Sequence, residues 1–298
     1  MSILRALSSL LIPLLLAVPA AAQVRPPVLP GSPDSSPHPA EEEVQVTYLA
    51  NAGFLLRSGK YSVLIDAFLK EPSNVYAALP PETFVNLVQA RPPFDGFVLA
   101  LVSHNHADHF QARGAEKFLT NNKQAQLISS PQVIATLKAS ARDYAAIQHH
   151  VTPVRPPQTL MQEEMSIEFL ALAHTGAENR EVQNLGHLIT MGGVKILHVG
   201  DAEPTLENFA PYGLAAKKID VAIVPYWYFG SEAGGRVLAE EIQARTLIAC
   251  HIPPKEFGKF SAAMKENHPE VLIFENALES RTFRPAPPAE KPGEKSGG

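Results

Sequence analysis

The chain contains little cysteine, little tryptophan and no excess of positive charge. Cys250 is the one cysteine and Trp227 the one tryptophan among 298 residues. A single cysteine cannot form an internal disulfide, which excludes the small disulfide-stapled modules found among secreted proteins. With 30 acidic against 25 basic residues the formal net charge is −5, so the sequence lacks a basic footprint for nucleic acid. Internal repeats are absent as well, which excludes solenoid architectures.

The first 22 residues have the pattern of a secretory signal peptide. Arg5 precedes an apolar stretch over residues 6–18, and Ala20 and Ala22 form a small-residue cleavage site. The alternative is a membrane anchor, but the apolar stretch is well short of the roughly 20 residues that a spanning helix needs. We therefore predict cleavage after Ala22, no stable membrane span in the mature chain, and export to the periplasm or the medium.

The composition divides the remaining chain into a linker, one domain and a tail. Residues 23–43 are rich in proline and poor in large apolar side chains, which predicts a disordered linker. Residues 285–298 contain mainly Pro, Lys, Glu, Gly and Ser and predict a disordered tail. Residues 44–284 have the hydrophobic content of one large globular domain.

Within this domain, strand patterns are interleaved with helical ones. We expect strands over residues 44–49, 53–57, 62–65, 97–102, 125–129, 166–172, 185–191, 194–199, 221–224, 246–250 and 270–274. We expect helices over residues 80–90, 114–121, 131–141, 205–209, 235–244 and 257–267. This order indicates an α/β domain with mixed sheets.

The segment from His104 to His109, with the sequence His-Asn-His-Ala-Asp-His, carries most of the chemistry. It follows directly on Ser103 and the apolar run 97–102, which predicts a loop after a buried strand. Imidazole and carboxylate are ligands of a borderline-soft divalent ion such as zinc, and the one-residue gap between His104 and His106 lets both reach one ion. Asp108 and His109 would then face a second ion. A surface loop that happens to be rich in histidine is the alternative.

The motif His-x-His-x-Asp-His after a strand resembles the signature of the metallo-β-lactamase-fold metal-dependent hydrolases. That family takes a third histidine, a bridging aspartate and a last histidine from later strand ends, and His174, Asp201 and His251 stand here in that order. The resemblance implies a four-layer αββα sandwich of two mixed sheets flanked by helices. It also implies two divalent ions, with zinc expected first and manganese or iron as alternatives. Their ligands would be His104, His106 and His174 on one ion, Asp108, His109 and His251 on the other, and Asp201 on both. Taken singly, a histidine at a strand end is more often an ordinary polar residue, and an aspartate after a glycine is often a turn residue.

Two more residues are candidates for supporting the ligands. Asp66 ends the expected strand 62–65 and matches the aspartate of the family's first motif. The resemblance implies that it accepts a hydrogen bond from a ligand histidine and so fixes the tautomer of that ring, while a helix or turn cap is the alternative. His198 lies close to Asp201 in sequence and is either a similar support or an ordinary core residue.

The site predicts a hydrolase. Two ions roughly 3.5–4 Å apart can activate a bridging hydroxide and hold a substrate oxygen, and Asp108 and Asp201 are the candidate catalytic residues that orient the nucleophile and carry its proton. We expect an exported enzyme that cleaves a lactone, a phosphodiester or a related ester or amide bond of a small molecule. A metal-binding or sensing module of the same fold, with little or no turnover, is the alternative.

The substrate is less well specified by the sequence. Tyr226 and Trp227, in an aromatic stretch after a strand, either line a pocket or pack at the domain edge, and Lys255 either meets an anionic group or is an ordinary exposed lysine. Residues 50–54 followed by 64–66 most resemble the branch of ascorbate-phosphate lactonases and N-acyl-phosphatidylethanolamine phospholipases. True β-lactamases of this fold generally lack the bridging aspartate, so Asp201 argues against antibiotic degradation.

Overall fold

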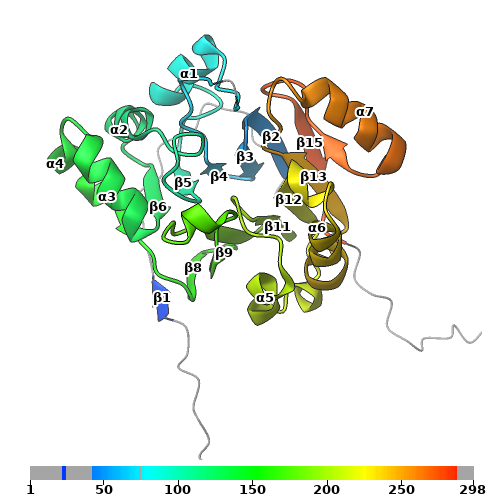
Figure 1. Ribbon diagram of the computed structural model, residues 1–298. Helices are drawn as coiled ribbons and strands as arrows, with labels where there is room; N and C mark the ends of the chain where they lie inside the picture. Colours follow the sequence, from blue (N-terminus) through cyan, green and yellow to red (C-terminus); the bar gives the residue numbers. More distant parts are fainter. Residues whose placement is uncertain (1–21, 25–41, 74, 287–298) are drawn as a thin grey trace, which may run out of the picture.

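The computed structural model describes residues 22–24, 42–73 and 75–286 (Figure 1). The predicted signal peptide up to residue 21, most of the predicted linker and the tail from residue 287 lie outside the described residues, so these predictions are not addressed by the structure. Gln23 and Val24, which we expected in the linker, belong to strand β1 (Ala22–Val24), which pairs in parallel with β8 (Gln158–Gln162). A sheet edge offers unpaired N–H and C=O groups, and an extended segment can satisfy them.

Two mixed sheets form the centre of the domain. The seven-stranded sheet has the order β15-β2-β3-β4-β5-β6-β7 and the eight-stranded sheet the order β1-β8-β9-β10-β11-β12-β13-β14. The bounds in the first sheet are β2 Val44–Ala50, β3 Gly53–Ser58, β4 Tyr61–Ile65, β5 Val98–Val102, β6 Gln126–Ser129, β7 Val151–Pro153 and β15 Ser280–Phe283. The remaining strands of the second are β9 Met165–Ala171, β10 Leu185–Met191, β11 Val194–His198, β12 Val221–Pro225, β13 Thr246–Cys250 and β14 Leu272–Ile273.

Each sheet contains a run of parallel strands, and this arrangement positions the site. Strands β4 to β7 pair in parallel in the first sheet, and β11 to β14 do so in the second. Parallel strands are buried on both faces and therefore read as continuous apolar runs, as β5 does with all its residues buried. Their carboxyl ends meet at one edge of the sheet, so the loops that follow β4, β5, β11 and β13 gather there.

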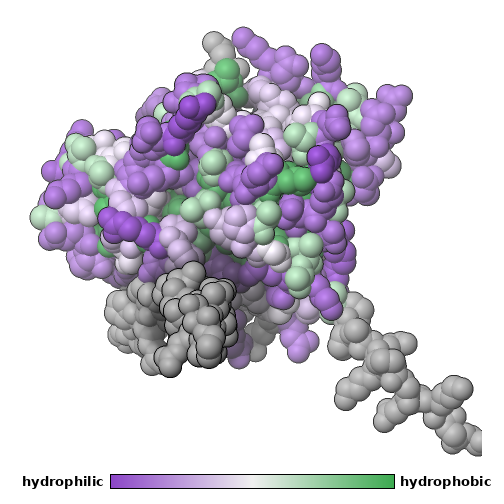
Figure 2. Space-filling model, turned by 60° about the horizontal axis from the view of Figure 1, so that its bottom comes forward, coloured by the Kyte–Doolittle hydropathy of each residue, from purple (hydrophilic) through white to green (hydrophobic). Residues whose placement is uncertain are grey.

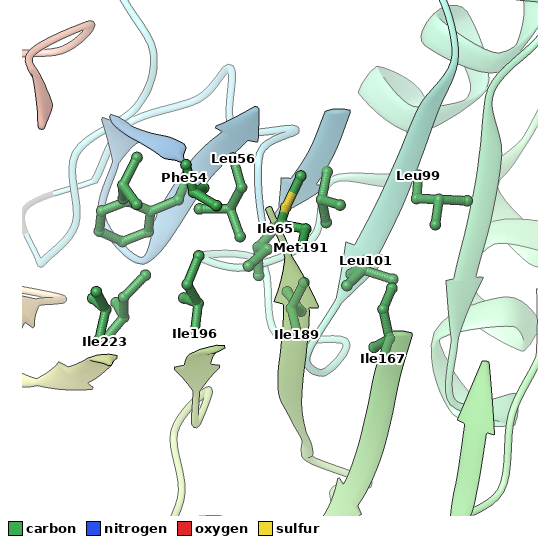
Figure 3. Packing of buried hydrophobic residues seen from close by; sticks show 14 of the residues in the cluster. Phe54, Leu56, Ile65, Leu99, Leu101, Ile167, Ile189, Met191, Ile196 and Ile223 are labelled. Atoms are coloured by element: carbon green, nitrogen blue, oxygen red, sulfur yellow. The ribbon is translucent and has the colours of Figure 1, made fainter. Parts of the chain in front are cut away.

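The two sheets pack face to face through a continuous apolar layer. Figure 3 shows Phe54, Leu56 and Ile65 of the seven-stranded sheet pointing toward Ile189 and Ile196 of the eight-stranded sheet. At roughly 25 cal/mol per Å² of apolar surface removed from water, burying one such side chain stabilises the fold by about 1.5–3 kcal/mol. This layer fixes the two sheets relative to each other and hence the two halves of the site.

Helices cover the outer face of each sheet (Figure 1). The seven-stranded sheet packs against α1 (Pro81–Val88), α2 (Ala112–Asn121), α3 (Pro131–Ser140) and α4 (Tyr144–Ile147), in a second apolar cluster. The eight-stranded sheet packs against α5 (Leu206–Phe209) and against the segment Val237–Ile242 that continues α6 (Glu232–Arg236). Met264 of α7 (Phe257–Asn267) packs near β13 and β14. The predicted α/β sandwich of two mixed sheets flanked by helices is therefore confirmed.

The sequence patterns missed the short elements at the margins. We expected no strand at β7, β8 or β15, whose residues are only partly buried and carry no clean alternation. The expected helix 235–244 is α6 continued by a π-helical segment, Val237–Ile242. Hydrophilic side chains cover most of the face shown in Figure 2, with hydrophobic ones showing between them. In the described part of the chain, every helix is too short or too polar to span a membrane.

Candidate metal centre

The structure gathers all seven sequence-predicted ligands at one edge of the sandwich, where the strand ends meet. The loop carrying His104 to His109 follows β5, His174 follows β9, Asp201 follows β11 and His251 follows β13. They form two adjoining groups, and within each group the potential ligand atoms all lie within 4.8 Å of one another. The groups are His104, His106 and His174, and Asp108, His109, Asp201 and His251.

The first group consists of three imidazoles that converge on one point. The ring centroids of His104, His106 and His174 lie 4.6–4.7 Å apart in every pairing. The Nε2 atoms of His104 and His174 are only 3.2 Å apart. Two ring nitrogens that face each other at this distance are suited to share a cation, since Zn–N bonds measure about 2.0–2.1 Å.

In the second group Asp201 lies between two imidazoles and reaches toward the first group. Its Oδ1 is 3.2 Å from Nε2 of His109, and its Oδ2 is 3.4 Å from Nε2 of His251 and 3.8 Å from Nε2 of His174. Asp108 places Oδ2 2.9 Å from Nε2 of His251 and 3.8 Å from Nε2 of His109. Asp201 is therefore the carboxylate placed to contact an ion in either group.

Hydrogen bonds at the opposite ring nitrogens fix the tautomers. Nδ1 of His109 lies 2.8 Å from a carboxylate oxygen of Asp66, and Nδ1 of His174 lies 2.6 Å from the carbonyl oxygen of Thr175. Carboxylate and carbonyl oxygens only accept, so both Nδ1 atoms must donate. A neutral ring then presents a lone pair at Nε2, the state that metal coordination requires.

The charges of the side chains in the centre favour the binding of a cation. Burial lowers the pKa of His109, but the charges of Asp201 and Asp66 outweigh burial and hold it well above its ordinary value. Burial raises the pKa of Asp201, but His109 and His251 outweigh burial and hold it well below the ordinary value. For His104, burial and the charge of His109 keep the pKa well below its usual range, so its ring stays neutral. Without a metal, a proton on His109 therefore compensates the carboxylates.

Three buried polar atoms of the second group have no hydrogen-bond partner among the described residues: Nδ1 of His251, Nε2 of His109 and Oδ1 of Asp201. An unpaired buried polar atom costs about 1–3 kcal/mol. The atoms of His109 and Asp201 lie 3.2 Å from each other, and a cation held by both would satisfy them together. The donor set of imidazoles and carboxylates thus fits divalent metal ions on geometry, charge and unsatisfied valence.

Asp66 and Ser103 hold the motif loop from behind. The carboxylate of Asp66 accepts hydrogen bonds from the backbone N–H of Ser103 at 2.7 Å and from its Oγ at 2.6 Å, in addition to that from His109. Burial alone would raise the pKa of Asp66, but the hydrogen bond and charge of His109 lower it to about 2. Ser103 Oγ also lies 3.0 Å from Nδ1 of His104. One buried carboxylate thus orients a histidine of the second group directly and one of the first group through Ser103.

A tight turn at Gly200 presents Asp201. The side chain of Asn184 accepts a hydrogen bond from the N–H of Asp201 at 3.1 Å and donates to the carbonyls of Leu172 and Val199. His198 accepts from the N–H of Gly200 at 3.2 Å, and its Nε2 lies 2.9 Å from the carbonyl of Ala52. His198 therefore supports the turn rather than a ligand side chain.

Asn51 joins the two loops that carry Asp108 and His251. Its Nδ2 donates to the carbonyl of Asp108 at 2.8 Å, and its own carbonyl accepts from the N–H of His251 at 3.0 Å. Asn51 and His251 both have a positive φ, at 55° and 59°. Left-handed backbone at residues other than glycine is costly and gathers at functional sites.

The three candidate pocket residues, Tyr226, Trp227 and Lys255, lie in different surroundings. Trp227 borders the centre, because its ring centroid is 5.2 Å from that of His251 in an edge-to-face arrangement. Tyr226 packs against both Trp227 and Phe260 of α7. Lys255 is exposed and makes neither a hydrogen bond nor an ion pair within the described part of the chain. Only Trp227 of these three touches a candidate ligand.

Comparisons with known proteins agree with this description. A family model described as "Beta-lactamase superfamily domain" matches residues 45–251. No curated protein sequence matches the chain. Among solved structures, an isothiocyanate hydrolase from Delia radicum gut bacteria is 16% identical with a TM-score of 0.59, and the match covers 80% of this chain and 99% of that one.

Two further structures bear on the fold. Igni18, a metallo hydrolase from Ignicoccus hospitalis, is 15% identical with a TM-score of 0.53, and the match covers 81% of this chain and 99% of that one. CmlA, a diiron β-hydroxylase from Streptomyces venezuelae, is 14% identical with a TM-score of 0.51, and the match covers 83% of this chain and 55% of that one. These likenesses show the fold that the chain shares with them.

Proposed function

This chain belongs to the family of β-lactamase superfamily domains, and from that premise we propose that it is a hydrolase that uses two divalent metal ions, with zinc the first candidate. The observation that carries the proposal is the pair of adjoining donor groups, with Asp201 between them and three buried atoms left unsatisfied. One of the similar solved structures is a diiron enzyme, which keeps iron among the candidate metals.

The proposed role of each residue follows from its position in the centre. His104, His106 and His174 would hold one ion, Asp108, His109 and His251 the other, and Asp201 both. When bound, two such ions supply a water-derived nucleophile at neutral pH and polarise the substrate oxygen under attack. Asp108 is a partly exposed member of the second group, where its carboxylate can orient the attacking water and accept its proton. The buried Asp66 and Ser103 keep the histidine rings in place during turnover.

We propose a lactone, a phosphodiester or a related ester or amide as the scissile bond. The short resemblance over residues 50–54 and 64–66 to ascorbate-phosphate lactonases and N-acyl-phosphatidylethanolamine phospholipases supports the first two. The flat ring of Trp227 beside His251 supports a substrate with an apolar portion near that bond. Export remains a prediction from the sequence of residues 1–22.

Hydrolysis of an aliphatic lactone and of an activated phosphodiester, measured side by side, tests the proposal. We expect one of the two to be hydrolysed, the activity to disappear after treatment with a chelator, and zinc or manganese to restore it. A matched buffer without chelator controls for inactivation during handling. If the metal-loaded protein hydrolyses neither substrate, hydrolysis of these bonds is contradicted and the non-enzymatic metal-binding module is favoured.

A further inference from the structure

A cavity of about 700 Å³ lies on the helical side of the loop that carries the motif. Asn105 and Ala107 of that loop line it, whereas none of the seven candidate ligands does. Cavities of roughly 300–1,000 Å³ are the usual size for small-molecule sites. The cavity is therefore adjacent to the candidate metal centre but separate from it.

The cavity has an apolar, aromatic wall. Phe84 of α1 and Phe110, just before α2, are buried residues that line it, and the half-buried Tyr76 is a third aromatic lining residue. Aromatic faces favour a flat or apolar body in contact with them. A ligand that uses this wall needs a hydrophobic portion.

Cationic side chains from separate segments surround the same cavity. They are Lys70, Arg113, Lys117 and Arg142, against one acidic lining residue, Glu71. Lys70 pairs with Glu71 at 2.5 Å and Arg113 with Glu116 at 2.9 Å. The side chains of Lys117 and Arg142 make no ion pair within the described residues. Two cations are thus available for a ligand, and the cavity has an excess of positive charge in a protein of net charge −5.

The first turn of α2 adds to this positive potential. Gln111, Ala112, Arg113 and Gly114 line the cavity, and the helix has no side-chain cap at its N-terminus. Gln111 instead accepts from the N–H groups of Lys70 and Glu71 and donates to the carbonyl of Ala107. The partial positive charge of the helix start therefore reinforces the lysine and arginine side chains.

We propose that this cavity is a second binding site, for a small anionic molecule with an aromatic or similarly flat apolar body, such as an aryl sulfonate, carboxylate or phosphate. The anionic group lies toward Lys117, Arg142 and the start of α2, and the apolar body lies on Phe84 and Phe110. A neutral apolar ligand would leave the cations unused, and a bare inorganic anion would leave the aromatic wall in water. Gln111, which lines the cavity, donates a hydrogen bond to the carbonyl of Ala107 in the motif loop. A ligand held in the cavity therefore contacts that loop without entering the metal centre.

Calorimetric titration of the purified protein with naphthalene-2-sulfonate tests this site directly. We expect saturable binding of one molecule per chain that weakens as ionic strength rises. Binding of the neutral naphthalene-2-sulfonamide should be at least about tenfold weaker, because it lacks the negative charge that strengthens hydrogen bonds from Lys117 and Arg142. The titration is repeated after chelator treatment, because binding at the metal centre would then disappear whereas binding in this cavity persists.

Matched charge reversals locate the probe. Lys117→Glu and Arg142→Glu should each weaken binding of the sulfonate by about tenfold or more. Lys259→Glu, an exposed lysine on α7 away from the cavity, should leave it unchanged. Circular dichroism confirms that each variant is folded. The proposal is overturned if the sulfonate does not bind, if it binds only when metal is present, or if Lys259→Glu weakens binding as much as the cavity variants do.

Discussion

Asp201→Asn is expected to abolish stable binding of at least one of two ions and to reduce any metal-dependent hydrolysis by roughly 1,000-fold or more. Asparagine preserves the shape of the side chain but removes the charge that lies within 3.2–3.8 Å of His109, His251 and His174. Losing a residue that merely supports a ligand costs about 10–100-fold in metal affinity or activity, and we expect a larger cost for the carboxylate that we propose as a ligand of both ions.

Metal content per chain after extensive dialysis, measured by elemental analysis beside initial rates, checks this expectation. Asp143→Asn is the matched control, because the exposed Asp143 caps α4 through its side chain and asparagine caps equally well. Retention of two ions by Asp201→Asn, or equal losses in both variants, would contradict the assignment of Asp201 to the centre.

Gly200→Ala is expected to destabilise the metal-free protein by about 2–5 kcal/mol. Gly200 has φ 58°, and a left-handed conformation costs an L-residue roughly 1–2 kcal/mol. A Cβ there would also lie 2.2 Å from Oδ1 of Asn184 and 2.8 Å from Cβ of Ser103. Neither neighbour can move away freely, because Asn184 holds the N–H of Asp201 and Ser103 holds Asp66. Overpacking of this kind typically adds about 1–3 kcal/mol.

Gly213→Ala separates the steric effect from the backbone effect. Gly213 has nearly the same φ, 54°, but a Cβ there would meet nothing within 4 Å. We expect it to cost only the backbone contribution of about 1–2 kcal/mol. Urea unfolding of both variants gives the comparison, and equal losses of stability would show that the packing around Gly200 does not hold the turn.

The sequence predicted the central strands and most helices because their patterns are local. A buried parallel strand such as β5 is a continuous apolar run that can be recognised without knowing its neighbours. Strands such as β7 and β8 were not predicted, because they become strands only through pairing with a neighbour at the sheet margin. The expectation of two facing sheets between layers of helices came from the resemblance rather than from any local pattern.

In the site, too, residues with a local sequence pattern were predicted, and residues that act through contacts between distant segments were not. The residues from His104 to His109 are adjacent in sequence. His174, Asp201 and His251 could be placed because the resemblance implies such residues in this order and each follows a recognisable strand. Asn184 carried no such signal, since its contact with Asp201 spans 17 residues and is made by an ordinary amide. In the sequence, Ser103 was recognisable only as the residue before the motif, and Asn51 only as one of residues 50–54, which carry the resemblance. Their roles depend on hydrogen bonds across elements that a sequence pattern cannot specify.

Titration of the metal-free protein with zinc in a calorimeter tests the central claim most directly. Two donor groups joined by Asp201 predict two zinc ions per chain, with protons released on binding because His109 must lose the proton that Asp201 and Asp66 hold on it. A stoichiometry of one, or no specific binding at all, would contradict the two-metal centre.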